Sequence, residues 1–267
     1  MTALRIGAHV DQIDPLTEAR GRGADLAQFF LGDPQGWKAP KLAYAGGAAA
    51  LRADAEAAGI DLYVHAPYLV NVATSNNRIR IPSRKILAEH AALAAEIGAK
   101  GLIVHGGHVL KSDDPETGYD NWAKTFERFD PPLPILIENT AGGENAIARR
   151  LERVARLWEV LDDRCDLSKI GICLDTCHAY SGGEELTGLV DRVKAITGRV
   201  DLVHANDSRD GFDSGADRHA NLDVGSIGGD EIVAVVAAAG APVVVETPGG
   251  AEGQGADIDF LRGHLPA

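Results

Sequence analysis

The chain has 267 residues, of which 45% are hydrophobic and 24% are charged, a composition that excludes a disordered protein. Its formal net charge of −13 argues against a general nucleic-acid binder, because lysine and arginine supply most phosphate binding. The three cysteines lack disulfide spacing, and neither a secretory signal nor an apolar run of membrane-spanning length is visible. We therefore expect a cytoplasmic protein with no membrane partner.

Eight short apolar segments recur along the chain, each followed by a longer helix-like or loop segment. Their composition predicts strands buried on both faces, as in parallel sheets, at 5–10, 25–31, 61–67, 101–107, 135–140, 170–176, 201–207 and 241–247. Between them, amphipathic patterns predict helices over 84–98 and 145–163. This alternation predicts an α/β fold, a (β/α)8 TIM barrel, formed by residues 1–267 as a single domain.

Each predicted strand ends in or near a polar residue, and in a barrel these ends meet at one face, where active sites lie. The residues are His9, Gln28, His65, His105, Glu138, Asp175, His204 and Glu246.

We take six of them, all except His9 and Gln28, as candidate metal ligands, and three more follow in the adjoining loops: His178, Asp217 and His219. Asp217 and His219 are two apart, so an extended segment projects both to one side. A single strand-end histidine is more often a hydrogen-bonded structural residue, and a lone aspartate is often a helix N-cap. Nine such residues together predict a multinuclear metal site. Cys173 and Cys177 are predicted to be small buried residues rather than ligands.

Several stretches carry a resemblance to a known family. They are HAPYLVNVAT (65–74), IENTAGGEN (137–145), LDTCHAYSGG (174–183), HANDS (204–208), DRHANLDVGSIG (217–228) and VVVET (243–247). With them, essentially the whole chain resembles endonuclease IV, the zinc-dependent apurinic/apyrimidinic endonucleases of base-excision repair. LDTCH, HANDS and DRHANL are the most specific of these motifs.

The resemblance implies three Zn²⁺ ions per chain. The first would be held by His65, His105 and Glu138; Glu138 would bridge to a second, completed by Asp175, His204 and Glu246; the third would bind His178, Asp217 and His219. Glu138 and Glu246 are the residues to which we assign a catalytic role. We leave open whether Mn²⁺ replaces one zinc, and we expect a monomer.

The activity implied by the resemblance is DNA repair by hydrolysis of the phosphodiester 5′ to an abasic site in double-stranded DNA. Zinc makes hydroxide available near neutral pH. The paired ions would supply this nucleophile, and the third would stabilise the departing 3′ oxygen, giving 3′-hydroxyl and 5′-deoxyribose phosphate ends. Positive ions in the site would also reduce the conflict between an acidic chain and a DNA substrate.

The family also implies DNA contacts. Tyr68 and Leu69 occupy the positions of residues that enter the helix at the lesion, while Gln35 stands where the family has an inserting arginine. In 76–85, basic residues including Arg78 and Arg80 would face phosphate or simply begin a solvated helix; we weigh the two equally. Arg218, between two ligands, is a further candidate for phosphate contact, and 208–216 is expected to be a flexible connector.

Two alternatives remain. A sugar isomerase or epimerase on a related divalent-metal barrel suits an acidic protein, but it leaves the set His178, Asp217 and His219 unexplained. A barrel that binds zinc or DNA without catalysis is the other. We expect metal analysis to separate them, since three zinc ions per chain favour the nuclease.

Overall fold

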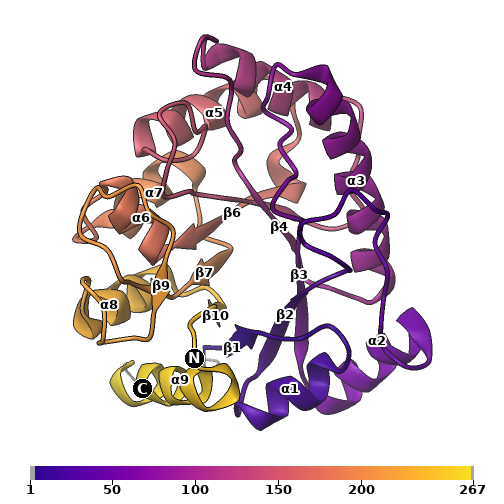
Figure 1. Ribbon diagram of the computed structural model, residues 1–267, viewed down its shortest axis with the longest axis vertical. Coiled ribbons are helices and arrows are strands. Elements are labelled where there is room, and N and C mark those ends of the chain that lie inside the picture. Colours follow the sequence, from indigo (N-terminus) through magenta and orange to yellow (C-terminus); the bar gives the residue numbers. More distant parts are fainter. Residues whose placement is uncertain (1–3, 266–267) are drawn as a thin grey trace.

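The protein, described here by a computed structural model of residues 4–265, closes eight parallel strands into a barrel in the order β1–β10–β7–β6–β5–β4–β3–β2 (Figure 1). The barrel strands are β1 (Ile6–His9), β2 (Leu26–Phe30), β3 (Asp61–His65), β4 (Leu102–His105), β5 (Ile135–Glu138), β6 (Ile170–Asp175), β7 (Leu202–His204) and β10 (Val243–Val245). Each overlaps one of the apolar segments, so the predicted (β/α)8 barrel is confirmed. Outside it, β8 (Asp207–Ser208) and β9 (His219–Ala220) form a short antiparallel pair.

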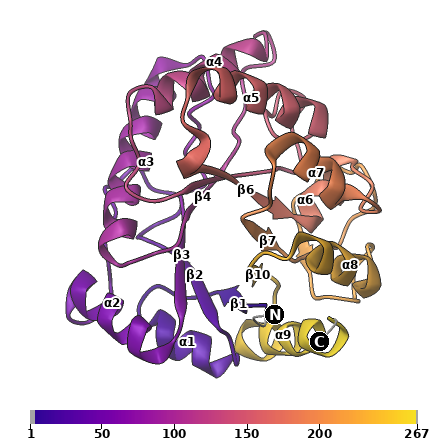
Figure 2. The ribbon, with the colours of Figure 1, turned by 180° about the vertical axis from the view of Figure 1, so that it is seen from behind.

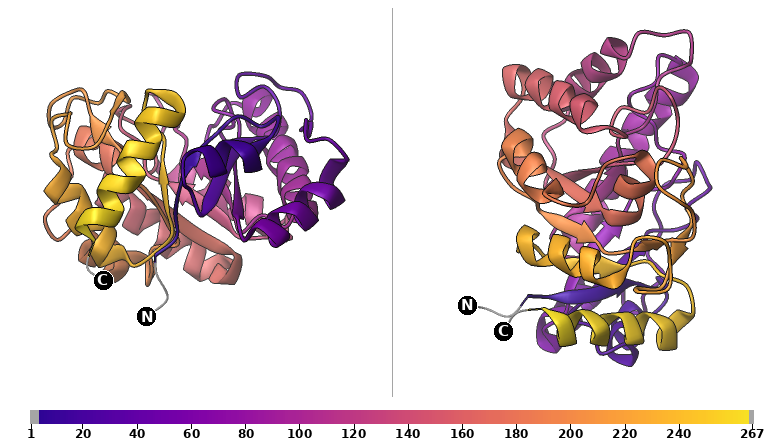
Figure 3. Two further views of the ribbon diagram at one scale, coloured as in Figure 1. Left: turned by 90° about the horizontal axis from the view of Figure 1, so that it is seen from below. Right: turned by 90° about the vertical axis from the view of Figure 1, so that its left-hand side faces the viewer.

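Helices surround the strands, as the front and back views show (Figures 1 and 2). They are α1 (Pro15–Gly21), α2 (Gly47–Ala58), α3 (Asn77–Glu96), α4 (Glu116–Phe126), α5 (Leu151–Arg164), α6 (Thr176–Gly182), α7 (Leu189–Thr197), α8 (Gly229–Ala239) and α9 (Gly250–His264), with a 3₁₀ turn at Leu167–Lys169. The side views show that α9, the last helix, packs beside α1 at the first strand, which closes the ring of helices (Figure 3). None of the helices within residues 4–265 is both long and apolar enough to span a bilayer.

Both faces of the barrel strands are buried: one set of side chains packs against the helices, and the other points into the barrel interior. Outward residues such as Ile6 and Ala8 pack under the helices, whereas a separate cluster fills the barrel interior: Leu26, Tyr63, Ile103, Leu136, Cys173, Leu202 and Val244. At the equivalent place on β1, Gly7 has no side chain, because a Cβ there would collide with the carbonyl of Leu26.

Side chains alternate along a strand, so the residue two positions after each interior residue also points inward, one layer nearer the C-terminal end. Those residues are His9, Gln28, His65, His105, Glu138, Asp175, His204 and Glu246. The polar layer at the mouth of the barrel is therefore a direct consequence of strand periodicity.

Two predicted helices have different limits in the structure. The helix predicted over 84–98 begins earlier, at Asn77, where the Asn76 side chain accepts a hydrogen bond from the backbone of Arg78. The prediction of a helix over 145–163 is wrong for its first six residues. The segment 145–150 instead pairs its backbone with the loops after β4 and β5, for example through Ile147 N–H to the carbonyl of Gly107 at 2.8 Å. These contacts use the groups that a helical turn would need.

Candidate metal centre

Neighbouring strands bring the predicted ligands together in register. His105 of β4 lies opposite Glu138 of β5, and Asp175 of β6 lies opposite His204 of β7. Because parallel strands place such pairs side by side at the barrel mouth, the four side chains converge without any contribution from flexible loops.

All nine predicted ligands fall into three groups whose ligand atoms lie within 4.8 Å of one another. The groups are His65, His105 and Glu138; Glu138, Asp175, His204 and Glu246; and His178, Asp217 and His219. These coincide with the three sets that the family resemblance implies, and Glu138 belongs to two of them.

Glu138 lies at the centre of the cluster and is fully buried. Its Oε2 lies 3.2 Å from His65 Nε2 and 3.4 Å from His105 Nε2, while its Oε1 lies 3.0 Å from His204 Nδ1. Since each oxygen faces a different set of imidazoles, this carboxylate has the geometry of a bridge between two cations.

The third group supplies the test of whether a metal fits. His178 Nε2 and His219 Nε2 are buried and make no hydrogen bond, although Asp217 Oδ1 lies 3.0 Å and 3.2 Å from them. Buried polar atoms without partners are costly. Zinc binds imidazole nitrogen and carboxylate oxygen. The convergence of the two Nε2 atoms and Asp217 Oδ1, without hydrogen-bond geometry, therefore fits a zinc ion.

Hydrogen bonds on the far side of the rings show which nitrogens face the centre. Nδ1 of His65 lies 2.7 Å from the carbonyl of Ala66, and Nδ1 of His178 lies 2.9 Å from that of Asn139. A carbonyl only accepts, so Nδ1 carries the hydrogen and Nε2 keeps its lone pair for a metal. Backbone carbonyls thus orient these two ligands.

The electrostatics of the cluster are those of a site built for cations. Burial opposes ionisation of Glu138, but the imidazoles of His204 and His105 hold its pKa well below the ordinary value. Burial also opposes a charge on His178, yet the Asp175 carboxylate and its neighbours raise the pKa of that imidazole well above the ordinary value. The raised pKa of His178 favours its protonated form in the metal-free protein, so binding of a metal ion to that imidazole would release a proton.

The two cysteines are buried, as predicted, and their exclusion as ligands stays a prediction, since Cys177 also lies within ligand distance of Asp175 and His219. Cys173 lies in the barrel interior and Cys177 in α6, both fully buried. Cys173 does lie within ligand distance of Glu138 and His204. Burial raises the pKa of each thiol to about 12, which keeps it protonated rather than in the thiolate form that binds metals.

Asparagines beside the ligands hold them in place, a role that we did not predict. Asn206 donates through Nδ2 to Asp175 Oδ2 at 2.7 Å and accepts from the backbone N–H of Glu246 at 2.8 Å. Asn139 accepts from the backbone of Asp175 at 2.8 Å. Asp175 also caps α6 through Oδ1, so its N-cap and site roles coexist. The sequence does place each asparagine close to a predicted ligand: Asn139 directly follows Glu138, and Asn206 comes two residues after His204. That proximity could have identified them.

A cavity of about 350 Å³ opens above the cluster, lined by ligand side chains together with Tyr68, Arg209 and Pro248. Arg209, another residue missing from our predictions, donates through Nε to the carbonyl of His219 at 2.9 Å. No ion pair within residues 4–265 includes its guanidinium, because Asp210, the carboxylate whose pKa it also lowers, pairs with Arg218. It therefore places a positive charge at the rim of the cavity.

Tyr68 projects from the loop after β3 and remains 55% exposed at the rim. Its ring packs against Phe30 and His65, with centroids 5.2 Å and 5.8 Å away. Its N–H donates to the carbonyl of Pro34 at 3.0 Å, which ties this loop to the one that carries the exposed Gln35. Partial burial of Tyr68, with the nearby carboxylates of Glu246 and Asp217, raises its pKa to about 12.

The other predicted DNA contacts have varied surroundings. Leu69 is partly buried and Arg78 is exposed at the start of α3. Arg80 donates to the carbonyl of Thr74 at 2.8 Å, and Arg218 forms an ion pair with Asp210. The segment 76–85 contains the start of α3, and its exposed cations are Arg78 and Lys85, the latter 3.7 Å from Glu89; phosphate contact by this segment stays a prediction.

The expectation of a flexible connector over 208–216 is wrong. Ser208 is buried in β8, and Gly215 N–H donates to the carbonyl of Ser181 at 2.8 Å. Asp213 accepts hydrogen bonds from Arg149 and Arg150 at 2.9 Å and 2.7 Å. These contacts anchor the segment to α6 and the loop before α5, which fixes the position of Asp217.

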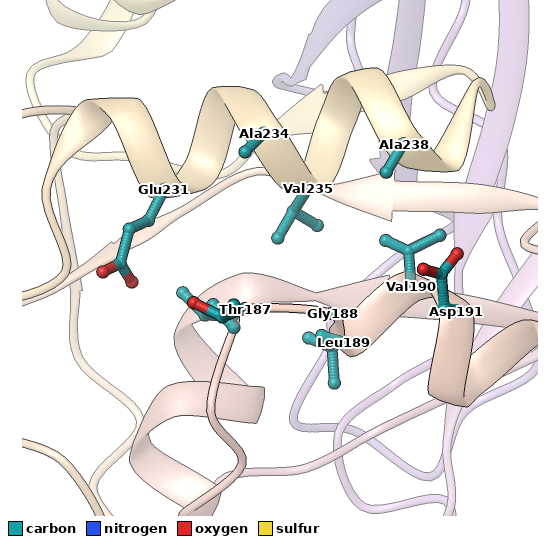
Figure 4. Close-up of a pocket in the computed structure, with 10 residues that line it drawn as sticks. Thr187, Gly188, Leu189, Val190, Asp191, Glu231, Ala234, Val235 and Ala238 are labelled. Atoms are coloured by element: carbon teal, nitrogen blue, oxygen red, sulfur yellow. The ribbon is translucent and has the colours of Figure 1, made fainter.

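A separate cleft of about 190 Å³ lies between α7 and α8 on the outside of the barrel (Figure 4). Apolar residues such as Leu189 and Val235 line most of it, with Asp191 and Glu231 at its edges. It contains none of the predicted site residues, so we place the functional site at the barrel mouth.

A family model described as xylose isomerase-like TIM barrel matches residues 16–264. The probable endonuclease 4 of Mycobacterium tuberculosis (strain ATCC 25177 / H37Ra) is 55% identical over 257 residues, covering 96% of this chain and 97% of that protein. The chain belongs to the endonuclease IV family. The probable endonuclease 4 of Mycobacterium marinum (strain ATCC BAA-535 / M) is 51% identical over 263 residues, covering 97% and 98%.

Among solved structures, endonuclease IV from Thermus thermophilus matches with a TM-score of 0.82 and 30% identity, covering 97% of this chain and 98% of that one. Membership of the endonuclease IV family confirms the resemblance found in the motifs and the predicted enzyme class, a nuclease. A D-tagatose 3-epimerase-like protein matches with a TM-score of 0.76 at 19% identity, which shows a shared barrel fold.

Proposed function

We propose that this chain is a DNA repair endonuclease that hydrolyses the phosphodiester 5′ to abasic sites in duplex DNA, using three zinc ions. The observation that carries the proposal is the convergence of nine ligand side chains into three groups, two of which share Glu138. The third group, His178 with Asp217 and His219, is the feature that a one- or two-metal isomerase would not need.

Zinc, when bound, would make water nucleophilic near neutral pH and neutralise charge on the phosphate. The chain's own contribution is to hold the ions and the substrate. We assign the first ion to His65, His105 and Glu138, the second to Glu138, Asp175, His204 and Glu246, and the third to the remaining group. Glu138 and Glu246, which serve the first two ions, are the carboxylates that we place beside the reacting phosphate.

Substrate contact would come from the rim of the cavity. Tyr68 presents an exposed, protonated phenol above His65 and His105, where it can fill the gap left by a missing base. Leu69 and Gln35 are proposed to enter the helix beside it. Because Gln35 carries no charge, its contribution would be shape and hydrogen bonding.

Positive charge near the cavity would guide the phosphate backbone despite the acidic chain. The Arg209 guanidinium at the rim donates to the carbonyl of His219 but forms no ion pair within residues 4–265, and Arg78 is exposed at the start of α3. Arg80 and Arg218 remain proposed contacts with existing partners. Phosphates would compete with the Asp210 carboxylate for Arg218. We therefore expect Arg209 to contribute more than Arg218 to DNA binding.

The test is to incubate the zinc-loaded protein with a duplex that carries one abasic site. We expect incision of the abasic strand, loss of incision after zinc is chelated, and no cutting of the same duplex with an intact base. Zinc analysis should find close to three ions per chain. Failure of the fully loaded protein to incise would contradict the proposal, and one or two ions would favour the isomerase.

A further inference from the structure

Gln28 is a fully buried polar side chain in the metal layer, although it is not one of the nine candidate ligands. It lies on β2, two residues after Leu26 of the barrel interior, and therefore points into the mouth. Burying an amide requires that its hydrogen-bonding groups be satisfied. The partners of Gln28 show what it does.

The Gln28 amide reaches across the barrel to two candidate ligands on other strands. Its Nε2 lies 2.6 Å from Glu246 Oε1, and its Oε1 lies 2.8 Å from His204 Nε2. Nε2 also lies 3.0 Å from His9 Nδ1. His204 and Glu246 belong to the same group of ligand atoms, so one side chain touches two of its four members.

The direction of each hydrogen bond follows from what each group can do. An ionised carboxylate only accepts, so the atom of Gln28 that faces Glu246 must be the amide NH₂. The carbonyl oxygen of Gln28 therefore faces His204, and it also only accepts. Hence His204 carries a hydrogen on Nε2 and keeps Nδ1 for a metal, on the side where Glu138 Oε1 lies 3.0 Å away.

We infer that Gln28 is a positioning residue of the metal centre, which fixes Nδ1 of His204 as the ligand atom and aims the Glu246 carboxylate. This inference rests on the metal-binding part of the proposed function and is independent of the substrate. At His65 and His178 a backbone carbonyl orients the ring, which no substitution removes. At His204 a side chain does so, and the effect can be tested by mutation.

The informative variant is Gln28→Met, which keeps the length of the side chain but removes its hydrogen bonds. His204 then loses the acceptor for its Nε2 hydrogen, and Glu246 loses a donor. Loss of such supporting hydrogen bonds typically weakens metal binding by about 10–100-fold. We expect a loss of this size for one zinc per chain, with the other two bound as in the unaltered protein.

Gln12→Met is the matched control. Gln12 also uses both ends of its amide, donating to the carbonyl of Gly32 at 3.1 Å and accepting from its N–H at 2.7 Å, but it touches no candidate ligand. Zinc affinity, measured by competition with a chromophoric chelator, should be unchanged in this variant. Equal losses in both variants would mean general destabilisation and would overturn the inference.

A second measurement reports the tautomer itself. In ¹⁵N-labelled, zinc-loaded protein, two-bond ¹H–¹⁵N spectra should show His204 protonated on Nε2. Gln28→Glu is the second variant, to be used if Gln28→Met does not fold. It retains an acceptor for the Nε2 hydrogen and should preserve that protonation state. Protonation of His204 on Nδ1, or unchanged zinc affinity in folded Gln28→Met, would overturn the inference. Absence of DNA incision with three zinc ions bound would contradict the proposed function and leave the role of Gln28 standing.

Discussion

Replacement of Glu138 by glutamine is the sharpest single perturbation of the site. The carboxylate is fully buried, and its two oxygens lie 3.0–3.4 Å from the imidazole nitrogens of His204, His65 and His105. The amide is isosteric but neutral, and one of its two oxygens becomes an NH₂ group that cannot bind a metal. The variant therefore removes a shared anion from two of the three ligand groups.

The magnitude follows from the cost of leaving buried charges without their partner, about 3–5 kcal/mol. At about 1.4 kcal/mol per tenfold change, this corresponds to a loss of roughly 10²–10⁴-fold in affinity for the ions that Glu138 serves. Glu138→Gln should then retain fewer zinc ions after dialysis and incise abasic DNA at least about 100-fold more slowly.

The assay is zinc analysis after dialysis, combined with single-turnover incision of a duplex with one abasic site. Glu144→Gln, in the loop after β5, is a suitable control because its partner is the exposed Lys111. Three zinc ions retained by Glu138→Gln, together with unchanged incision, would refute the bridging role of this carboxylate.

Three further outcomes are expected. Tyr68→Ala should bind abasic duplex about tenfold more weakly in fluorescence anisotropy, since aromatic stacking on a base contributes about 1–3 kcal/mol. Tyr68→Phe should retain binding. Equal affinities of Tyr68→Ala and the unaltered protein would argue against a substrate contact. Arg209→Gln should reduce the slope of log K against log salt by about 1, and Arg218→Gln, already ion-paired, should change it less; the reverse order would contradict the assignment. Zinc affinity, measured by calorimetry, should rise from about pH 6 to about pH 8. The raised pKa values of His178 and His204 keep both imidazoles protonated in the metal-free protein until the pH passes those values, so binding releases protons; affinity independent of pH would contradict this.

Much of the site could be predicted from sequence because strand periodicity is local. His65, His105, Glu138 and Asp175 each end an apolar run, and the barrel brings such ends to one face. The partition of the ligands into three groups came from the family resemblance, and the distances in the structure agree with it.

What the sequence did not predict depends on contacts between distant segments. In the sequence, Gln28 is one polar residue at a strand end among several. Its role depends on its contacts with His204 and Glu246, which only the folded barrel brings together. The segment 145–150 has a helical pattern, yet its backbone pairs with the loops after β4 and β5. Likewise, the polar composition of 208–216 suggested mobility, whereas Asp213 and Gly215 fasten it to its surroundings.

The position and chemistry of the cut test the central claim most directly. A duplex with one abasic site and labels on both ends of that strand should be treated with zinc-loaded protein, and the fragments analysed by mass spectrometry. We predict a single incision 5′ to the abasic site, with a 3′-hydroxyl on one fragment and a 5′-deoxyribose phosphate on the other. Incision on the 3′ side, with an unsaturated aldehyde end formed by elimination, would contradict hydrolysis at this metal centre.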